Sequence, residues 1–491
     1  MGVLSNLEPK NVFYFFEEIC KIPHGSGNVE QISDYLVDFA KQRNLYYEQD
    51  EVKNVIIIKE ATKGYEDQPP MILQGHMDMV AVKKPDCDID MKTEGLRLKV
   101  AGDKVYAEGT SLGGDDGIAV AYGLALLDAD NIPHPRLEVV ITVDEEVGLN
   151  GAKVIDLSRL KANRMINLDS EEEGIFLTSC AGGARVDCVL PVKRTVMQGI
   201  AVDLSVEGLL GGHSGAEIHK ERGNSNCLMG RILYKLSQQV NVGICELQGG
   251  LADNAIPRQT TAVLVVEEKD KAALEAVIAA ERAAIAGELA SKDSGFSVFL
   301  SEVEKDMQDE GSTFHCVAGE AAVKCAAFLT ALPNGVQAMS ADIPGLVETS
   351  LNMGLLSLKE DGIHAGFAVR SSVESAKSAL ISKLQAVTAL AGGSIKVSGD
   401  YPGWQYRVDS PLRDKMVRIY REMYGHEPKV EAIHAGLECG ILGSKIPNLD
   451  CVSLGPDMKD IHTTEETLSI SSTKRVWEYL VRLLGEKEKD K

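Results

Sequence analysis

Short apolar runs alternate with amphipathic stretches over the first part of the chain. Apolar residues recur every three or four positions at 11–20 and 29–43, which predicts helices. Between the amphipathic stretches lie continuous β-rich apolar runs, at 55–58, 71–73, 137–143 and 165–168. A further helix is expected at 117–127, after a glycine-rich turn. Strands without polar alternation, separated by helices, are typical of a sheet that is covered on both faces.

The pattern changes near residue 186. Half-exposed strands are expected at 200–206, 243–247 and 261–266, with helices at 224–240 and 271–289. A similar order of elements then follows, with helices at 317–332 and 374–391 and strands at 296–303, 346–356, 362–369 and 394–397. This order predicts two α+β units in tandem, built from antiparallel strands with helices on one face.

The α/β pattern resumes after residue 400. Helices are expected at 411–424 and 473–484, and strands at 430–433 and 451–453. The sequence therefore predicts one α/β domain, made of residues 1–185 and 401–491, which is interrupted by an inserted α+β domain at 186–400.

Composition limits the class of protein. The 491 residues are 44% hydrophobic and 25% charged, as in globular proteins, and they are numerous enough for more than one domain. The formal charge of -22 argues against nucleic acid and anionic membranes as partners. No apolar run of about 18 residues occurs. The start lacks the features of a secretory signal, and the ten cysteines include no Cys-x-x-Cys, so we expect a cytoplasmic protein with reduced thiols.

A histidine and an aspartate follow one of the buried runs. The segment Met71-Ile72-Leu73-Gln74-Gly75-His76-Met77-Asp78 ends a predicted strand, where open α/β sheets place their ligands. His76 and Asp78 are two residues apart, so in an extended chain they would face the same side. An imidazole beside a carboxylate suits a metal ligand and the group that orients it. Taken alone, such a pair more often forms an ordinary hydrogen bond in a loop than a metal site.

Further acidic and histidine-containing clusters lie near predicted strand ends or turns. Each has an ordinary explanation, such as a helix cap at Asp115 or a solvated turn at Asp144. Together with His76 and Asp78 they supply two histidines and at least three carboxylates, which suits two divalent ions, and the lack of thiolates favours catalytic over structural ions. The clusters are Gly113-Gly114-Asp115-Asp116-Gly117, Asp144-Glu145-Glu146-Val147-Gly148, Asn167-Leu168-Asp169 and Asp460-Ile461-His462-Thr463-Thr464-Glu465.

These motifs occur in an order that resembles a known family. The chain is similar to the co-catalytic zinc peptidases related to carboxypeptidase G and the tripeptidase T enzymes. Its length, its double-size insert and the segments at 22–26 and 434–440 narrow the resemblance to the branch of the family that cleaves Xaa-His dipeptides. The additional motifs are Ile22-Pro23-His24-Gly25-Ser26, Gly211-Gly212-His213-Ser214-Gly215, Asn254-Ala255-Ile256-Pro257 and His434-Ala435-Gly436-Leu437-Glu438-Cys439-Gly440.

The resemblance implies a fold and a set of metal ligands. The fold would be a zinc-peptidase-like catalytic domain, with a mixed, largely parallel sheet and helices on both faces, interrupted by an inserted α+β lid domain. His76 and Asp169 would bind one zinc ion, Glu146 and His462 the other, and Asp115 would bridge them. Spacing alone leaves open whether Asp115 or Asp116 bridges. Cobalt or manganese would suit the same ligands.

The resemblance also implies roles in catalysis and in substrate binding. Asp78 would orient His76, and Glu145 would be the general base. In the lid, His213 would stabilise the oxyanion, while Asn254 and Arg370 would hold the substrate, with Arg370 at its carboxylate. An arginine in this position could equally pair with a surface acid. We also expect Glu438 to bind the free amino group of the substrate, although it could instead be a charge at a helix N-terminus.

The expected function is therefore hydrolysis of short unblocked peptides, in particular Xaa-His dipeptides such as carnosine. A related amide hydrolase, such as a deacylase of N-acyl amino acids, is the alternative enzyme. A metal-dependent binding protein without catalysis is the alternative of another class. The expected partner is a small peptide substrate, with no nucleic acid and no membrane, and the oligomeric state stays open between monomer and homodimer.

Overall fold

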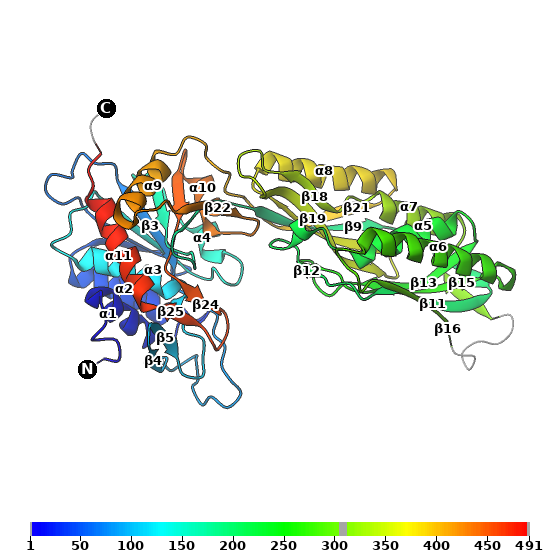
Figure 1. Ribbon diagram of the computed structural model, residues 1–491, viewed down its shortest axis with the longest axis horizontal. Coiled ribbons are helices and arrows are strands. Elements are labelled where there is room, and N and C mark those ends of the chain that lie inside the picture. The colour runs from blue at the N-terminus through cyan, green and yellow to red at the C-terminus, as the bar shows by residue number, and fades with distance from the viewer. Residues whose placement is uncertain (1, 304–311, 489–491) are drawn as a thin grey trace. The chain divides into compact units, whose positions relative to one another are not determined.

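The computed structural model describes residues 2–303 and 312–488, and the chain divides in it into two units (Figure 1). The first unit comprises Met1–Cys180, Trp404–Ala432 and Leu437–Lys491, and the second comprises Ala181–Gly403 and Ile433–Gly436. The second unit begins and ends a few residues outside the expected insert. It also takes up Ile433–Gly436, which the sequence placed in the last part of the first domain.

The first unit is built on a mixed sheet. In order across the sheet, its strands within the described residues are β1 (Tyr46–Gln49), β2 (Val55–Lys59), β6 (Leu137–Thr142), β3 (Met71–His76), β7 (Arg164–Asn167), β23 (Asp450–Ser453), β8 (Ile175–Cys180) and β22 (Lys429–Ile433). Strands β6, β3, β7 and β23 pair in parallel, whereas β1, β2 and β8 pair antiparallel with their neighbours. The expected mixed sheet is confirmed, with its parallel part at the centre.

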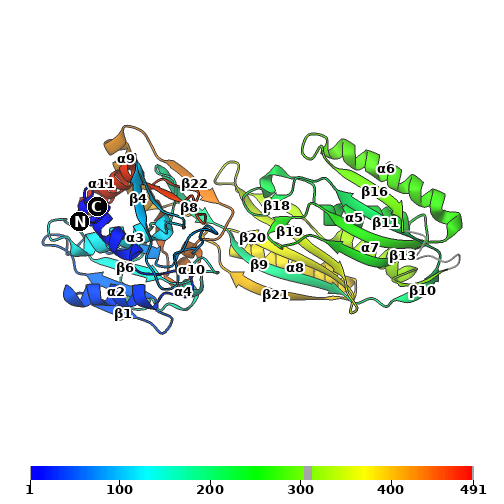
Figure 2. The same ribbon diagram turned by 90° about the horizontal axis from the view of Figure 1, so that it is seen from below.

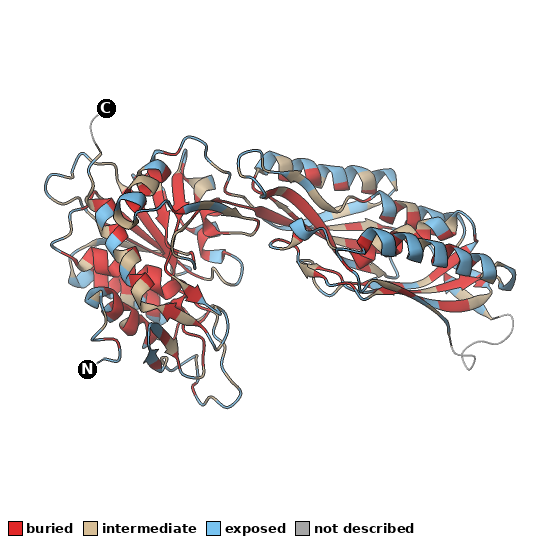
Figure 3. Ribbon diagram, in the orientation of Figure 1, coloured by how far each residue is buried: buried red, intermediate tan, exposed pale blue. Residues whose placement is uncertain are grey.

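Both faces of this sheet are covered. Ile57, Leu73 and Val139 belong to one large apolar core, and their neighbours Ile72 and Val140, which point to the other face, are buried as well. Figure 3 shows the central strands of this sheet in the colour of buried residues. The helices are α1 (Lys10–Cys20), α2 (Glu30–Gln42), α3 (Gly114–Asp128), α4 (Asn150–Val154), α9 (Pro411–Tyr424), α10 (Glu438–Lys445) and α11 (Ile470–Gly485). A smaller antiparallel sheet contains β24 (Met458–Lys459), β25 (Thr467–Ser469), β5 (Lys104–Ala107) and β4 (Leu98–Ala101).

The second unit is one continuous antiparallel sheet with helices on one face. The expected pair of α+β units is joined, because Gln248 and Gly249 of β13 pair with Ser357 and Leu356 of β19. The strand order is β16 (Ser297–Glu302), β11 (Ile200–Glu207), β15 (Thr260–Val266), β13 (Val242–Gly249), β19 (Val347–Leu358), β20 (Ile363–Ser371), β9 (Gly182–Leu190) and β21 (Ser394–Tyr401), with β18 (Gly335–Met339) also paired to β19.

One apolar core holds the helices of the second unit to this sheet. Val202, Leu204 and Val206 of β11 face the core, whereas Asp203 and Ser205 between them do not, so the strand alternates as the sequence predicted. The helices that contribute to the core are α5 (Ser225–Ser237), α6 (Lys271–Leu289), α7 (Glu320–Ala331) and α8 (Glu374–Leu390) (Figure 2). Two short strand pairs complete the unit: β10 (Thr195–Gln198) with β17 (Thr313–Cys316), and β12 (Gly212–His213) with β14 (Ala255–Ile256).

Two general expectations concern the whole chain. The ten cysteines are free thiols, as predicted. Within the described ranges, no helix combines the length and the apolar character that crossing a membrane requires.

Candidate active site

Parallel pairing brings three of the polar clusters to one edge of the main sheet. His76 is the last residue of β3, and it is paired in register with Thr142, the last residue of β6. On the other side, Gln74 of β3 is paired with Asn167, the last residue of β7. Because parallel strands end at a common edge, His76, the acidic run after β6 and Asp169 just beyond β7 meet there.

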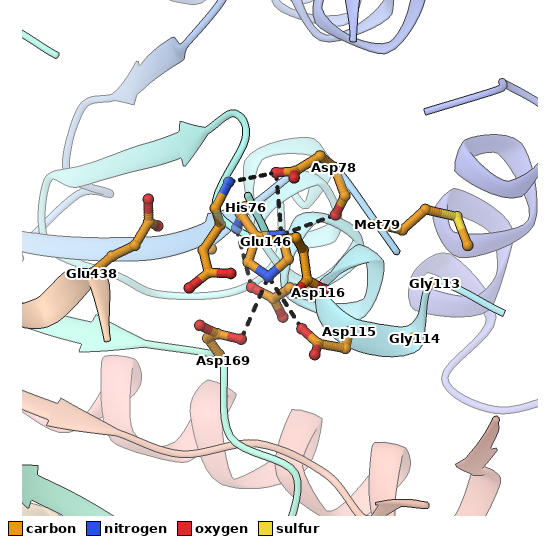
Figure 4. Close-up of polar contacts among 12 residues, drawn as sticks. His76, Asp78, Met79, Gly113, Gly114, Asp115, Asp116, Glu146, Asp169 and Glu438 are labelled. Carbon is orange, nitrogen blue, oxygen red and sulfur yellow. Dashed lines mark hydrogen bonds and ion pairs between the residues drawn. The ribbon is translucent and has the colours of Figure 1, made fainter. Parts of the chain in front are cut away.

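Asp115 lies between the two predicted histidine ligands. It follows Gly114 at the start of α3, and His462 lies in the turn between β24 and β25. The Oδ1 atom of Asp115 is 3.1 Å from Nε2 of His76 (Figure 4). Its Oδ2 atom is 3.1 Å from Nε2 of His462. One carboxylate therefore faces both imidazoles, as a bridging ligand would.

Each imidazole also faces a second carboxylate. Nε2 of His76 is 3.6 Å from Asp169, and Nε2 of His462 is 2.9 Å from Glu146. Ligand atoms of Asp115, Glu146 and His462 all lie within 4.8 Å of one another. Ligand atoms of His76 and Asp169 form another such group with Asp116, and Asp115 is 3.1 Å from His76. The structure thus brings the five predicted ligands close to one another, with Asp116 beside them. Imidazole nitrogens and carboxylate oxygens are donors that zinc, cobalt and manganese accept.

The electrostatics of the site favour added positive charge. Burial and neighbouring carboxylates raise the pKa of Glu145 to about 9 and that of Asp169 to about 6. Asp115 and Glu146 raise the pKa of His462 to about 10. Among the protein groups alone, protons must therefore offset the crowded negative charge. Divalent ions bound by the same atoms would replace those protons, so the residues present fit a metal centre.

Asp116 has surroundings different from those of Asp115. It is fully buried, and its Oδ2 atom accepts a hydrogen bond from the backbone N–H of His76 at 3.1 Å. Burial and the charge of Asp169 raise its pKa well above the ordinary value. Spacing could not distinguish the two aspartates. Of the two aspartates, Asp115 is the one whose carboxylate contacts both imidazoles.

Asp78 lies beside His76, but not as the sequence suggested. Strand β3 ends at His76, so the two residues do not share a strand face. Nδ1 of His76 is 2.9 Å from the backbone carbonyl oxygen of Asp78 and 3.5 Å from its carboxylate. The Asp78 carboxylate also accepts hydrogen bonds from the backbone N–H of Glu145 at 3.1 Å and from the hydroxyl of Ser26 at 2.8 Å. The carbonyl oxygen and the carboxylate of Asp78 thus both face Nδ1 of His76, and the carboxylate in addition holds the backbone of Glu145.

Glu438 is buried in a polar layer beneath the site. Its Oε2 atom accepts hydrogen bonds from Gln74 at 2.5 Å and from Thr142 at 2.6 Å, and Asn167 donates to Gln74. Its Oε1 atom has no hydrogen-bond partner among the described residues. Burial raises the pKa of Glu438 to about 7. The strand register brings these partners together. Gln74 lies two residues before His76 on β3, and Thr142 and Asn167 are the last residues of β6 and β7.

The residues predicted in the insert lie in the second unit. His213 in β12 is paired with Ala255 in β14, and the backbone N–H of Ser214 donates to the carbonyl oxygen of Asn254 at 2.8 Å, which brings His213 and Asn254 together. Nδ1 of His213 accepts hydrogen bonds from the N–H groups of Gly215 and Ala216. Nε2 therefore carries the proton of the neutral ring.

Arg370 lies near His213 in the second unit. It is on β20, opposite Ser350 of β19, and its Nε atom is buried without a hydrogen-bond partner among the described residues. Burial and the charge of Arg370 lower the pKa of His213 and bring that of His434 to about 3. The unit thus gathers a guanidinium group and two neutral imidazoles, which is a suitable environment for an anionic group.

The sequence analysis missed supporting residues around the site. Ser26 holds the Asp78 carboxylate, and Glu466 accepts hydrogen bonds from the loop that carries Asp115. The motif that contains Ser26 was recognised, but no pattern assigned it a partner. Nothing in the sequence distinguishes Glu466 from Glu465 beside it.

Comparison with known proteins places the chain in a family. Residues 72–486 match the model of Peptidase family M20/M25/M40. The chain is 35% identical to the cytosol non-specific dipeptidase of Escherichia coli (strain K12) over 488 residues, which cover 99% of both chains. It is also 35% identical to the aminoacylhistidine dipeptidase of Vibrio alginolyticus, whose crystal structure matches with a TM-score of 0.93 over 99% of each chain. The aminopeptidase PepT of Bacillus cereus shares the fold, with 15% identity, a TM-score of 0.55 and 98% coverage of both chains.

The chain therefore belongs to Peptidase family M20/M25/M40. The predicted resemblance and the predicted fold class are confirmed, and so is the expectation that the chain is a peptide hydrolase.

The contact between Asp78 and Glu145 can be tested by substitution. Asp78→Ala removes the acceptor of the Glu145 N–H group and should lower kcat on a dipeptide on the order of 10- to 100-fold, with Asp78→Glu retaining part of the activity. Ser26→Ala is the matched control, because it removes the other partner of the same carboxylate. It should have a smaller effect. Unchanged turnover in folded Asp78→Ala protein would contradict this role.

Proposed function

We propose that the protein is a metal-dependent dipeptidase that cleaves short peptides with free ends, with Xaa-His dipeptides such as carnosine as its substrates. The observation that carries the proposal is the position of Asp115 between Nε2 of His76 and Nε2 of His462, at 3.1 Å from each. The substrate class is supported by the two relatives of 35% identity, one named a non-specific dipeptidase and the other an aminoacylhistidine dipeptidase.

We assign the ligands to two divalent ions. His76 and Asp169 would hold one, Glu146 and His462 the other, and Asp115 both. Zinc is the ion of first choice, and cobalt and manganese fit the same donors. Bound ions of this kind supply positive charge that polarises a carbonyl group and favours ionisation of water. The hydrogen bond from Nδ1 of His76 to the carbonyl oxygen of Asp78 fixes the tautomer of the ring, which leaves Nε2 free to act as the ligand atom.

Glu145 is the proposed general base. Its backbone is held by Asp78, and its side chain lies in the same crowded group of carboxylates as Asp169 and Glu146. The carboxylate accepts a proton from the attacking water and delivers it to the leaving nitrogen. Its raised pKa means that Glu145 needs nearby positive charge to be ionised near neutral pH, and the two ions would supply that charge.

Residues of the second unit, the proposed lid, complete the reaction. Because Nδ1 of His213 accepts two backbone hydrogen bonds, its Nε2–H group is available to donate to an oxyanion. The guanidinium group of Arg370 can bind the substrate's C-terminal carboxylate through two parallel hydrogen bonds. Asn254 lies next to His213 on the neighbouring strand segment and is the third proposed contact.

Glu438 is the proposed partner of the substrate's amino group. Gln74 and Thr142 occupy one of its oxygens, and Oε1 is left for an ammonium group. Because the side chain is fully buried, the amino group must reach into the polar layer beneath the metal ligands. The loss of hydration that destabilises a buried carboxylate is offset when an opposite charge, such as an ammonium group, binds to it.

We further propose that the protein acts in the cytoplasm, in keeping with the name of the Escherichia coli relative. A homodimer remains one of two options for its assembly.

The general base is tested by Glu145→Gln. This variant keeps the size of the side chain but removes its basicity, so kcat should fall by about 100-fold or more while the metal content is unchanged. Glu172→Gln, at an exposed glutamate, is the control for loss of one negative charge and should behave as wild type. Near wild-type turnover by Glu145→Gln would exclude Glu145 as the base.

Recognition of the two substrate ends is tested by a pair of variants that control for each other. Arg370→Ala should raise KM for a free dipeptide by about 10-fold or more and abolish its preference over the C-terminal amide. Glu438→Ala should instead reduce the preference over the N-acetylated dipeptide. The preferences are measured as ratios of kcat/KM. If Arg370→Ala leaves KM unchanged, or if Glu438→Ala leaves the discrimination unchanged, the corresponding assignment is wrong.

The reaction class is tested with carnosine, other Xaa-His dipeptides, tripeptides and N-acyl amino acids, before and after chelation. Dipeptides should be cleaved, chelation should abolish the activity, and zinc should restore it. Zinc affinity should fall as the pH is lowered, because Zn²⁺ competes with protons for the imidazoles of His76 and His462. The raised pKa values of both residues favour the protonated form in this competition. Preferential cleavage of N-acyl amino acids would favour a deacylase, and a zinc-loaded protein without any activity would favour a binding protein.

A further inference from the structure

A single buried carboxylate collects the backbone N–H groups of the loop before α3. Oε2 of Glu466 accepts hydrogen bonds from the N–H groups of Leu112 at 2.7 Å and Gly113 at 3.0 Å. Oε1 accepts from those of Gly114 at 2.8 Å and Asp115 at 3.3 Å. Glu466 is only 3% exposed, so water cannot replace these contacts.

The loop has the shape of an anion-binding nest. Gly113 has φ of 67° and ψ of 33°, which is the left-handed conformation that glycine adopts without strain. A left-handed residue beside right-handed neighbours turns successive N–H groups toward one point, where they bind negative charge. Burial raises the pKa of Glu466, whereas the four N–H groups that donate to it favour its carboxylate form.

Glu466 also belongs to the turn that carries His462. Strands β24 and β25 pair through Met458 with Leu468 and Lys459 with Thr467, so the residues between them form one hairpin turn. Glu466 lies near the end of this turn, four residues after His462. The other end of the contact is Asp115, 351 residues earlier in the chain. One side chain thus fastens two distant segments that each carry a proposed metal ligand.

We propose that Glu466 is a positioning residue of the metal centre, which fixes Asp115 relative to His462. The observation behind this inference is that the last N–H group of the nest belongs to Asp115 itself, whose Oδ2 atom is 3.1 Å from Nε2 of His462. The inference rests on the proposed two-ion site, and it assigns to Glu466 the geometry of the ion that Asp115 and His462 share, rather than any contact with substrate.

Replacement of Glu466 by glutamine should weaken binding of this ion. An amide has one acceptor oxygen, and its NH2 group would face two N–H groups of the nest, so the loop must move. In Glu466→Gln, the affinity for one of the two ions should fall on the order of 10- to 100-fold, with the other ion retained. The measurement is calorimetric titration of the full-length, metal-stripped protein with Zn²⁺, supported by the absorption spectrum of the Co²⁺ form. On a dipeptide, kcat should fall in parallel while KM changes little.

Glu465→Gln is the matched control. The substitution removes the same charge at the adjacent residue. Glu465 is exposed, however, and pairs with Lys84 at 2.6 Å on the surface. It should bind both ions and turn over as wild type. Glu466→Asp keeps the charge but is one methylene shorter, so it should lose less affinity than Glu466→Gln, and it replaces that variant if the glutamine protein does not fold.

Two results separate this inference from the proposed function. If folded Glu466→Gln or Glu466→Asp protein binds both ions with wild-type affinity and keeps its kcat, losing only thermal stability, the positioning role is overturned and the two-ion site stands. If the wild-type chain itself binds fewer than two Zn²⁺ ions, the proposed function fails first, and the positioning role fails with it.

Discussion

The repulsion among closely spaced carboxylates at one edge of the main sheet is the constraint on which the site depends. Glu145, Glu146 and Asp169 lie close together there, and Asp115 joins them from α3. Carboxylates in such proximity can all ionise only if positive charge is close by. In the protein alone, the imidazoles and bound protons supply it. Two divalent ions would supply it more fully, and the same residues provide a suitable ligand set for them.

Parallel strands explain how residues so far apart in sequence reach this edge. Short polar segments follow the central strands β6, β3 and β7. The register pairs the last residues of β6 and β3, and it pairs the last residue of β7 with Gln74, two residues before the end of β3. The layer one step below, with Gln74 and Thr142 around Glu438, is buried and hydrogen-bonded. It gives the ligands a rigid base. The hairpin turn after β24 adds His462 from another part of the chain, and Glu466 fastens that turn to the start of α3.

The sequence predicted those parts of the fold and site that depend on local pattern. Continuous apolar runs located β2, β3, β6 and β7, and the ends of β3, β6 and β7 supply the proposed ligands His76, Glu146 and Asp169. The clusters at the start of α3 and after β24 supply Asp115 and His462. Contacts set by distant pairing could not be read from the sequence in this way. The pairing of β13 with β19, which merges two expected units into one sheet, depends on residues more than 100 positions apart. The roles of Asp78 and Glu466 depend on where single N–H groups point, which no spacing of residue types reveals.

The central claim is that Asp115 joins two ions, one held with His76 and Asp169 and the other with Glu146 and His462. The most direct measurement is anomalous diffraction at the zinc absorption edge from crystals of the zinc-loaded protein. The account predicts two anomalous peaks roughly 3.5–4 Å apart, each within coordinating distance of one oxygen of Asp115. A single peak, or two peaks of which only one contacts Asp115, would contradict it.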